Sequence, residues 1–132
     1  MNIKSSKQLV EEANKSIKSL SPSEIKDLLQ KKEITLIDIR DIRELWRDGT
    51  LKDSIHIPRG MLEFWLDPSS EYFQEKKIGD KKNIVLFCAL GFRSALATKA
   101  LKDMGFENVA NASGGFAALK DSGVEVILKE KN

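Results

Sequence analysis

The sequence predicts an α/β fold in which a central parallel sheet of about five strands carries helices on both of its faces. Two short apolar runs, 34–40 and 84–87, have the composition of strands that are buried on both sides. Other segments show the helical spacing of apolar residues, and the clearest of them covers 93–104. Strands that alternate with helices in this way favour a parallel sheet.

The chain has 132 residues, which is the length of a single domain. Its net charge is +2, and lysines and acidic residues are interspersed, so neither nucleic acid nor a membrane surface is expected as a partner. No apolar stretch approaches the roughly 18 residues that a membrane span needs, and the first residues lack the apolar core of a signal peptide. We therefore expect a cytoplasmic protein.

Residues 1–20 are expected to form an N-terminal extension helix, followed by the main domain over residues 21–132. Apolar residues recur at helical spacing over 6–20, so that one face either packs on the domain or binds a partner. The next helix is predicted to begin after Ser21. Ser21 suits the N-cap, Pro22 suits the first helical position, and Glu24 completes a capping box.

The run at 34–40 is expected to be a strand that ends in polar side chains. In an open parallel sheet, the carboxyl ends of the strands border the functional site. Asp38 and Arg40 therefore belong near the site, together with Glu44 from a short helix predicted around 43–46. We expect Asp38 to hold the loop or an arginine through a charge-assisted hydrogen bond, and all three residues to support the site rather than do its chemistry. A solvated pair at the strand end is the alternative.

The rest of the chain supplies shorter elements. His56 is interpreted as structural because it lies inside a short strand pattern, and a chain with one histidine and one cysteine is not expected to hold a metal. Arg59 leaves that strand beside a glycine, where it either steers an anionic substrate or remains a surface residue. The other expected elements are a turn at 48–49, strands at 54–57 and 107–112, a short helix at 61–65, a polar surface loop at 76–82, a double-glycine turn at 114–115 with a helix after it, and an edge strand at 124–128.

The only cysteine, Cys88, lies where the second apolar run ends and the helix over 93–104 begins. The first amides of a helix lack intrahelical partners and carry the positive end of its dipole, so a loop that ends there attracts anions. Gly91 lets the backbone turn sharply toward the sulfur, and Arg93 adds positive charge. We expect Cys88 to be a reactive thiolate, with an inert core thiol as the alternative. The expected anion-stabilising loop comprises Ala89, Leu90, Gly91, Phe92, Arg93 and Ser94.

Three motifs carry a resemblance to a known family. Cys-Ala-Leu-Gly-Phe-Arg-Ser at 88–94 resembles the active-site loop of rhodanese-like sulfurtransferases, Cys-x-x-Gly-x-Arg-Ser. Asp-Ile-Arg at 38–40 with Glu44 is similar to the signature Asp-Val-Arg-x-x-x-Glu of the same family, and the double glycine at 114–115 resembles its Gly-Gly segment. The resemblance covers residues 21–123 and implies the rhodanese-like fold.

The resemblance implies a sulfurtransferase without a metal or organic cofactor. Cys88 would take sulfane sulfur from a donor such as thiosulfate, hold it as a persulfide, and pass it to cyanide, a thiol or a protein acceptor. One alternative is a rhodanese-like module that carries sulfur, binds a protein or senses oxidation without turnover. Another is a phosphatase or an arsenate reductase. The related phosphatases have a longer loop than the four residues between Cys88 and Arg93, and the chain has no second cysteine.

Overall fold

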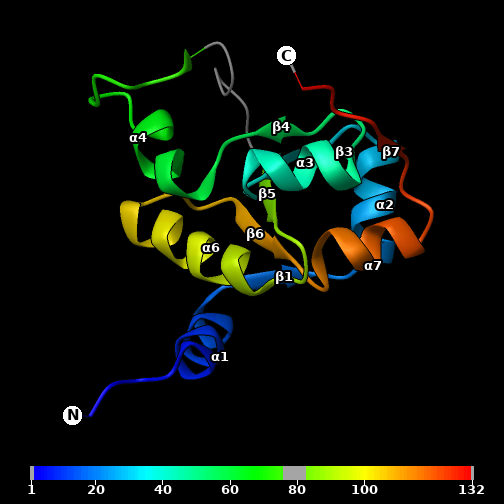
Figure 1. The fold of residues 1–132 in the computed structure, drawn as a ribbon. Coiled ribbons are helices and arrows are strands. Elements are labelled where there is room, and N and C mark those ends of the chain that lie inside the picture. The colour runs from blue at the N-terminus through cyan, green and yellow to red at the C-terminus, as the bar shows by residue number, and fades with distance from the viewer. Residues whose placement is uncertain (1, 76–82, 132) are drawn as a thin grey trace.

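A computed structural model describes residues 2–75 and 83–131, so the polar loop expected at 76–82 lies outside the described residues. The strands are β1 (Lys18–Leu20), β2 (Thr35–Asp38), β3 (Thr50–Leu51), β4 (Ile55–His56), β5 (Ile84–Phe87), β6 (Val109–Ala112) and β7 (Val126–Ile127). In this part of the chain, five of them form a parallel sheet in the order β1-β6-β5-β2-β4. Figure 1 labels β1, β6, β5 and β4 of this sheet. The other two, β3 and β7, pair antiparallel in a small separate sheet.

Helices cover both faces of the parallel sheet (Figure 1). They are α1 (Ser6–Ser16), α2 (Pro22–Gln30), α3 (Ile42–Asp48), the 3₁₀ turn η1 (Arg59–Met61), α4 (Leu62–Leu66), α6 (Phe92–Met104) and α7 (Gly115–Asp121). One apolar core lies beneath α4 and α6, and a second core lies between the other face of the sheet and the helices α2 and α7. The α/β fold predicted from the sequence is therefore confirmed.

The register of the central strands brings their carboxyl ends to one edge of the sheet. β5 lies between β2 and β6, with Asp38 opposite Phe87 and Leu86 opposite Asn111. Cys88 follows Phe87 directly, so the cysteine leaves the sheet at the same edge as Asp38 and the end of β6. This edge is where parallel α/β sheets place their functional residues.

The start of α2 follows its predicted capping signals, and α6 ends at a glycine. Ser21 and Glu24 form the reciprocal capping box at the start of α2, since the Ser21 hydroxyl accepts from the Glu24 amide at 3.2 Å and the Glu24 carboxylate accepts from the Ser21 amide at 3.0 Å. Gly105 ends α6 in the left-handed conformation, with φ 110°. Along α6, Ala97 and Leu101 are buried in the core while Met104 is exposed, so the buried face of the helix runs through Ala97 and Leu101.

The helix expected over 6–20 is shorter than predicted. α1 ends at Ser16, and Ile17 is already extended, with φ −113° and ψ 161°. Lys18–Leu20 then forms β1, an edge strand that runs parallel to β6. Burial of Leu20 in the core and hydrogen bonds to β6 outweigh one more turn of helix. The division of the chain at residue 20 stays a prediction, although β1 belongs to the main sheet.

The edge strand expected at 124–128 is also placed differently. Its central residues form β7, which pairs with β3 rather than joining the parallel sheet, and Leu51 lies opposite Val126. The fifth strand of the parallel sheet is β1 instead. Three residues of β1 were too few to show a strand pattern against the helical spacing before them.

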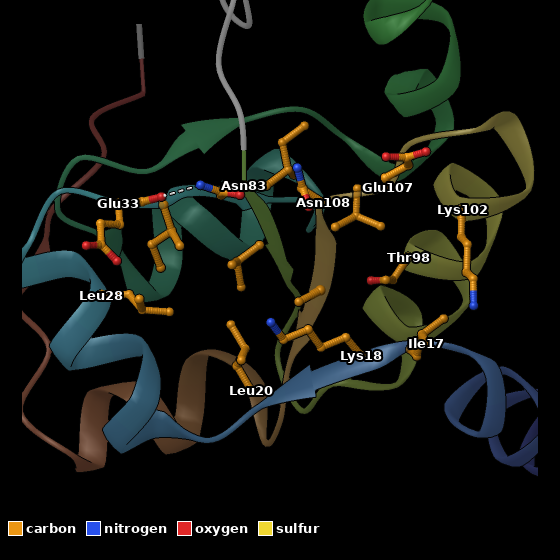
Figure 2. A pocket seen from close by; sticks show the side chains of 15 residues that line it. Ile17, Lys18, Leu20, Leu28, Glu33, Asn83, Thr98, Lys102, Glu107 and Asn108 are labelled. Carbon is orange, nitrogen blue, oxygen red and sulfur yellow. Dashed lines mark hydrogen bonds between the residues drawn. The ribbon is translucent and has the colours of Figure 1, made fainter.

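A cavity of about 340 Å³ lies at the amino edge of the sheet (Figure 2), and Cys88 is not among the residues that line it. Lys18 from β1 and Lys102 from α6 line it together with Glu33 and Glu107, so the charges of its polar lining balance. None of the helices in residues 2–75 and 83–131 has the length and apolar character that a membrane span requires.

A fully buried ion pair joins three elements next to the functional edge. The Arg40 guanidinium donates to the Asp38 carboxylate through Nε at 3.0 Å and Nη2 at 2.8 Å, and Nη2 also donates to the Gly49 carbonyl at 2.7 Å. The Thr50 hydroxyl donates to the same carboxylate at 2.7 Å, and the Phe116 ring of α7 lies 4.2 Å from the guanidinium carbon. The network therefore fastens β2 to β3 and α7. Asp38 holds an arginine, as expected, rather than the cysteine loop.

We predict that Arg40→Met lowers the free energy of unfolding by about 3–5 kcal/mol, because it leaves the Asp38 carboxylate buried without a countercharge. Urea denaturation followed by circular dichroism measures the change. The matched control is Arg43→Met, which breaks an exposed pair with Asp41 and is expected to lower the free energy of unfolding far less, because water screens that pair. Equal losses in the two variants would contradict a structural role for the buried pair.

Candidate active site

The sulfur of Cys88 is buried and is surrounded by polar hydrogen-bond donors. Cys88 is 1% exposed. Its Sγ accepts from the main-chain amide of Gly91 at 3.2 Å and from the amide of Ser94 at 3.4 Å, and it lies 3.3 Å from the Ser94 hydroxyl oxygen. These contacts meet the sulfur at the N-terminus of α6, where the helix dipole favours negative charge. The arrangement suits a sulfur atom that carries negative charge.

The turn between β5 and α6 depends on Gly91. Its φ of 101° lies in the left-handed region, which glycine adopts readily and residues with a Cβ atom rarely adopt. A Cβ atom at this position would also approach the Gly114 nitrogen to 3.3 Å. The conformation turns the Gly91 amide back toward Cys88, which explains why the loop contains a glycine three residues after the cysteine.

The start of α7 holds the other side of the cysteine loop. The Phe116 amide donates to the Cys88 carbonyl at 2.8 Å, and the Ala117 amide donates to the Ala89 carbonyl at 3.2 Å. Gly115 makes this approach possible, because a Cβ atom there would lie 2.5 Å from the Cys88 carbonyl oxygen. The tight turn expected from the double glycine is present, and it lies against the cysteine loop.

Arg93 stands at the mouth of the site and is paired with Glu44 of α3. The two guanidinium nitrogens donate to the two carboxylate oxygens at 2.8 and 3.0 Å. The Glu44 carboxylate raises the pKa of Arg93, and Cys88 adds to this effect. In return, Arg93 lowers the pKa of Glu44. The sequence placed Glu44 near the cysteine loop, and the structure brings it to the arginine of that loop.

The remaining loop side chains point outward. Leu90 is 57% exposed and Phe92 is 60% exposed, so two apolar side chains flank the buried sulfur at the surface. Ala89 is half-buried. The loop therefore presents its main chain to the sulfur and its apolar side chains to an approaching molecule.

Arg59 and His56 take part in other contacts. The Arg59 guanidinium donates to the Glu63 carboxylate at 2.8 Å, within η1 and α4. The His56 ring nitrogen Nε2 lies 2.7 Å from the Arg40 carbonyl oxygen, in line with a structural interpretation of this histidine. Among residues 2–75 and 83–131, no group of three or more histidine, cysteine, aspartate or glutamate residues could hold a metal ion.

Sequence reasoning missed Asn111 of β6. Its side-chain amide is buried and donates from Nδ2 to the Gly91 carbonyl at 3.1 Å. The available signal was a polar residue inside the otherwise apolar strand Val109–Ala112, three residues before Gly114. We read this segment only as a strand, because an isolated asparagine has no chemistry that points to a site.

We predict that Gly115→Ala destabilises the protein by about 3 kcal/mol, from the left-handed φ of 61° and the clash of the new Cβ atom with the Cys88 carbonyl. Thermal denaturation measures the loss. Gly60→Ala is the control, because a Cβ atom at Gly60 meets nothing within 4 Å. A Gly115→Ala protein as stable as Gly60→Ala would show that α7 does not press on the cysteine loop.

Comparison with known proteins places this site in a family. The profile of the rhodanese-like domain matches residues 21–122. A Mus musculus protein named thiosulfate sulfurtransferase/rhodanese-like domain-containing protein 3 is 31% identical in an alignment of 103 residues that covers 75% of this chain and 66% of the mouse protein. The match therefore spans slightly less than two thirds of that relative.

Two solved structures extend the likeness to almost the whole chain. A Rhodopseudomonas palustris protein, described as of unknown function and a possible tyrosine phosphatase, is 41% identical with a TM-score of 0.88, over 96% of this chain and 97% of that one. The polysulfide-sulfur transferase homodimer of Wolinella succinogenes is 32% identical with a TM-score of 0.69, over 96% and 89% of the two chains. Some of the similar proteins are named as sulfurtransferases. Because the family profile matches most of its length, this chain belongs to the rhodanese-like domain family.

Proposed function

We propose that this protein is a single-domain sulfurtransferase that carries sulfane sulfur on Cys88. The observation that supports this most directly is the convergence of the Gly91 and Ser94 amides on a buried sulfur at the start of α6. These donors stabilise negative charge both on a thiolate and on a persulfide. Family membership supplies independent support, because relatives bear the names of thiosulfate and polysulfide sulfurtransferases.

In the first half-reaction, the thiolate of Cys88 attacks the sulfane sulfur of a donor such as thiosulfate. A sulfur–sulfur bond forms to Cys88 while the sulfur–sulfur bond of thiosulfate breaks, and the electron pair of that bond leaves with sulfite. Cys88 is then a persulfide. The amides that held the thiolate lie beside the new charge, which supports oxyanion-hole-type stabilisation in the transition state.

In the second half-reaction, a nucleophilic acceptor attacks the outer sulfur of the persulfide. Cyanide takes that sulfur as thiocyanate, and the thiolate of Cys88 leaves with the electron pair of the broken bond. A small thiol or a cysteine of an acceptor protein would take the sulfur in the same way and become a persulfide itself. The two half-reactions form a ping-pong cycle in which no metal or organic cofactor takes part.

Arg93 is proposed to orient an anionic donor at the mouth of the site. Both terminal guanidinium nitrogens of Arg93 donate to the Glu44 carboxylate. This ion pair reduces the net positive charge that a donor meets. Arg59 remains a candidate for long-range steering only, since its guanidinium is paired with Glu63. The Gly91 and Ser94 amides then carry most of the stabilisation of the sulfur.

Two other functions use the same residues. A sulfur carrier or redox-sensing module would form the persulfide without rapid turnover. A phosphatase is raised by the description of the Rhodopseudomonas palustris structure. Against it stands the spacing of four residues between Cys88 and Arg93, which is shorter than the loop of the related phosphatases.

We predict that the purified protein forms thiocyanate catalytically from thiosulfate and cyanide. Mass spectrometry after thiosulfate treatment should show the addition of one sulfur atom, which cyanide then removes. Cys88→Ser is expected to abolish both signals, since it removes the nucleophile while keeping a similar shape. Hydrolysis of para-nitrophenyl phosphate is expected to be absent.

The outcomes separate the three functions. A sulfur adduct on Cys88 without catalytic thiocyanate formation would favour the carrier. Release of para-nitrophenol that Cys88→Ser abolishes would favour the phosphatase. If neither thiosulfate nor inorganic polysulfide leaves a sulfur atom on the folded protein, sulfur transfer is the wrong function.

A further inference from the structure

Asn111 is a buried polar side chain on a face of the sheet that is otherwise apolar. It lies opposite Leu86 of β5, and alternate residues of a strand share one face, so it lies on the same side as Val109. Leu86 and Val109 both belong to the core beneath α6. Asn111 itself is 4% exposed. It is therefore placed under the first turns of the helix that begins at the cysteine loop.

Asn111 is bonded to the residue that presents an amide to the sulfur. Its Nδ2 donates to the Gly91 carbonyl at 3.1 Å, and that carbonyl also accepts from the Ala95 amide at 3.2 Å. The amide of Gly91 in turn donates to Cys88 Sγ at 3.2 Å. One side chain thus restrains the glycine whose N–H group reaches the sulfur.

Stability does not explain an asparagine at this position. Its Oδ1 atom is buried and has no hydrogen-bond partner among the described residues. A buried acceptor without a partner is unfavourable, because the group has lost its water. Leucine has nearly the same size and would fill this place in the apolar core without that cost. A residue that is poor for stability and bonded to the cysteine loop points to function.

We propose that Asn111 is a positioning residue that locks Gly91 so that its amide remains on the sulfur of Cys88. That this restraint favours the reaction rests on the proposed function, in which the sulfur of Cys88 carries negative charge in both half-reactions. Asn111 does not touch the sulfur itself. Its bond to the Gly91 carbonyl restrains a residue that has no side chain and whose φ of 101° would otherwise relax easily.

Loss of this restraint should weaken the amide contact to the sulfur of Cys88 and slow the reactions of that sulfur as a nucleophile. Removing one main-chain-type donor from an anionic centre typically lowers a rate by about 10²–10³-fold, and loosening it is expected to have a smaller effect of about tenfold. The reaction of Cys88 with iodoacetamide reports on the thiolate directly and needs no sulfur donor. Its outcome is therefore independent of whether the protein transfers sulfur.

The test measures the rate of alkylation of Cys88 against pH in the wild type, Asn111→Leu and Asn111→Asp, together with thermal stability. For Asn111→Leu we expect unchanged or higher stability and alkylation about tenfold slower than in the wild type at neutral pH. Asn111→Asp should be slower still, since a carboxylate cannot donate to the Gly91 carbonyl and its charge opposes the thiolate. Asn108→Leu, on the exposed approach to β6, is the control and should behave as the wild type.

A wild-type alkylation profile in Asn111→Leu would overturn the proposal, whatever happens to its stability. A lower stability with an unchanged profile would assign Asn111 to packing alone and would overturn it as well. If Asn111→Asp fails to fold, Asn111→Ala replaces it, because the alanine variant also lacks the donor to Gly91. Slower alkylation in the folded variants, with Asn108→Leu unaffected, supports the assignment.

Discussion

Main-chain amides that point at the sulfur of Cys88 are the interaction on which the rest of the site depends. The sulfur is almost completely buried, so water cannot stabilise charge on it. The donors must come from the fold, and they come from Gly91 and Ser94 where a central strand gives way to a helix. The sheet register, the left-handed glycine and the α7 turn behind the loop all serve to place these two amides.

Two ion pairs near this edge have different consequences because one is buried and the other is not. Asp38 and Arg40 satisfy each other inside the protein and join β2 to α7, so they contribute rigidity. Glu44 and Arg93 form a partly exposed pair, so solvent screens their charges more than those of the buried pair. The sequence motif that contains Asp38, Arg40 and Glu44 therefore contributes a buried ion pair inside the protein and the carboxylate that pairs with Arg93 of the cysteine loop.

The sequence was sufficient to predict the features that depend on local patterns. The α/β fold, the α2 capping box and the position of Cys88 between a strand and a helix follow from apolar runs, capping residues and one glycine. β1 was missed because three residues of strand gain their stability from a neighbour about 90 residues away in the chain, which no local pattern records. Asn111 was missed for the same reason, since its importance lies in a bond to Gly91, a residue 20 positions before it.

The geometry of the loop also bears on which atom it is built to hold. Its two inward amides both converge on Sγ, and the arginine at its end is bonded to Glu44. A single sulfur atom with one negative charge needs little more than this. A phosphate dianion needs donors for three outer oxygens, and the loop of four residues between Cys88 and Arg93 is shorter than the loop of the related phosphatases. The apolar side chains of Leu90 and Phe92 at the rim add no donor either. The physical demands of the ligand therefore favour sulfur over phosphate in this member of the family.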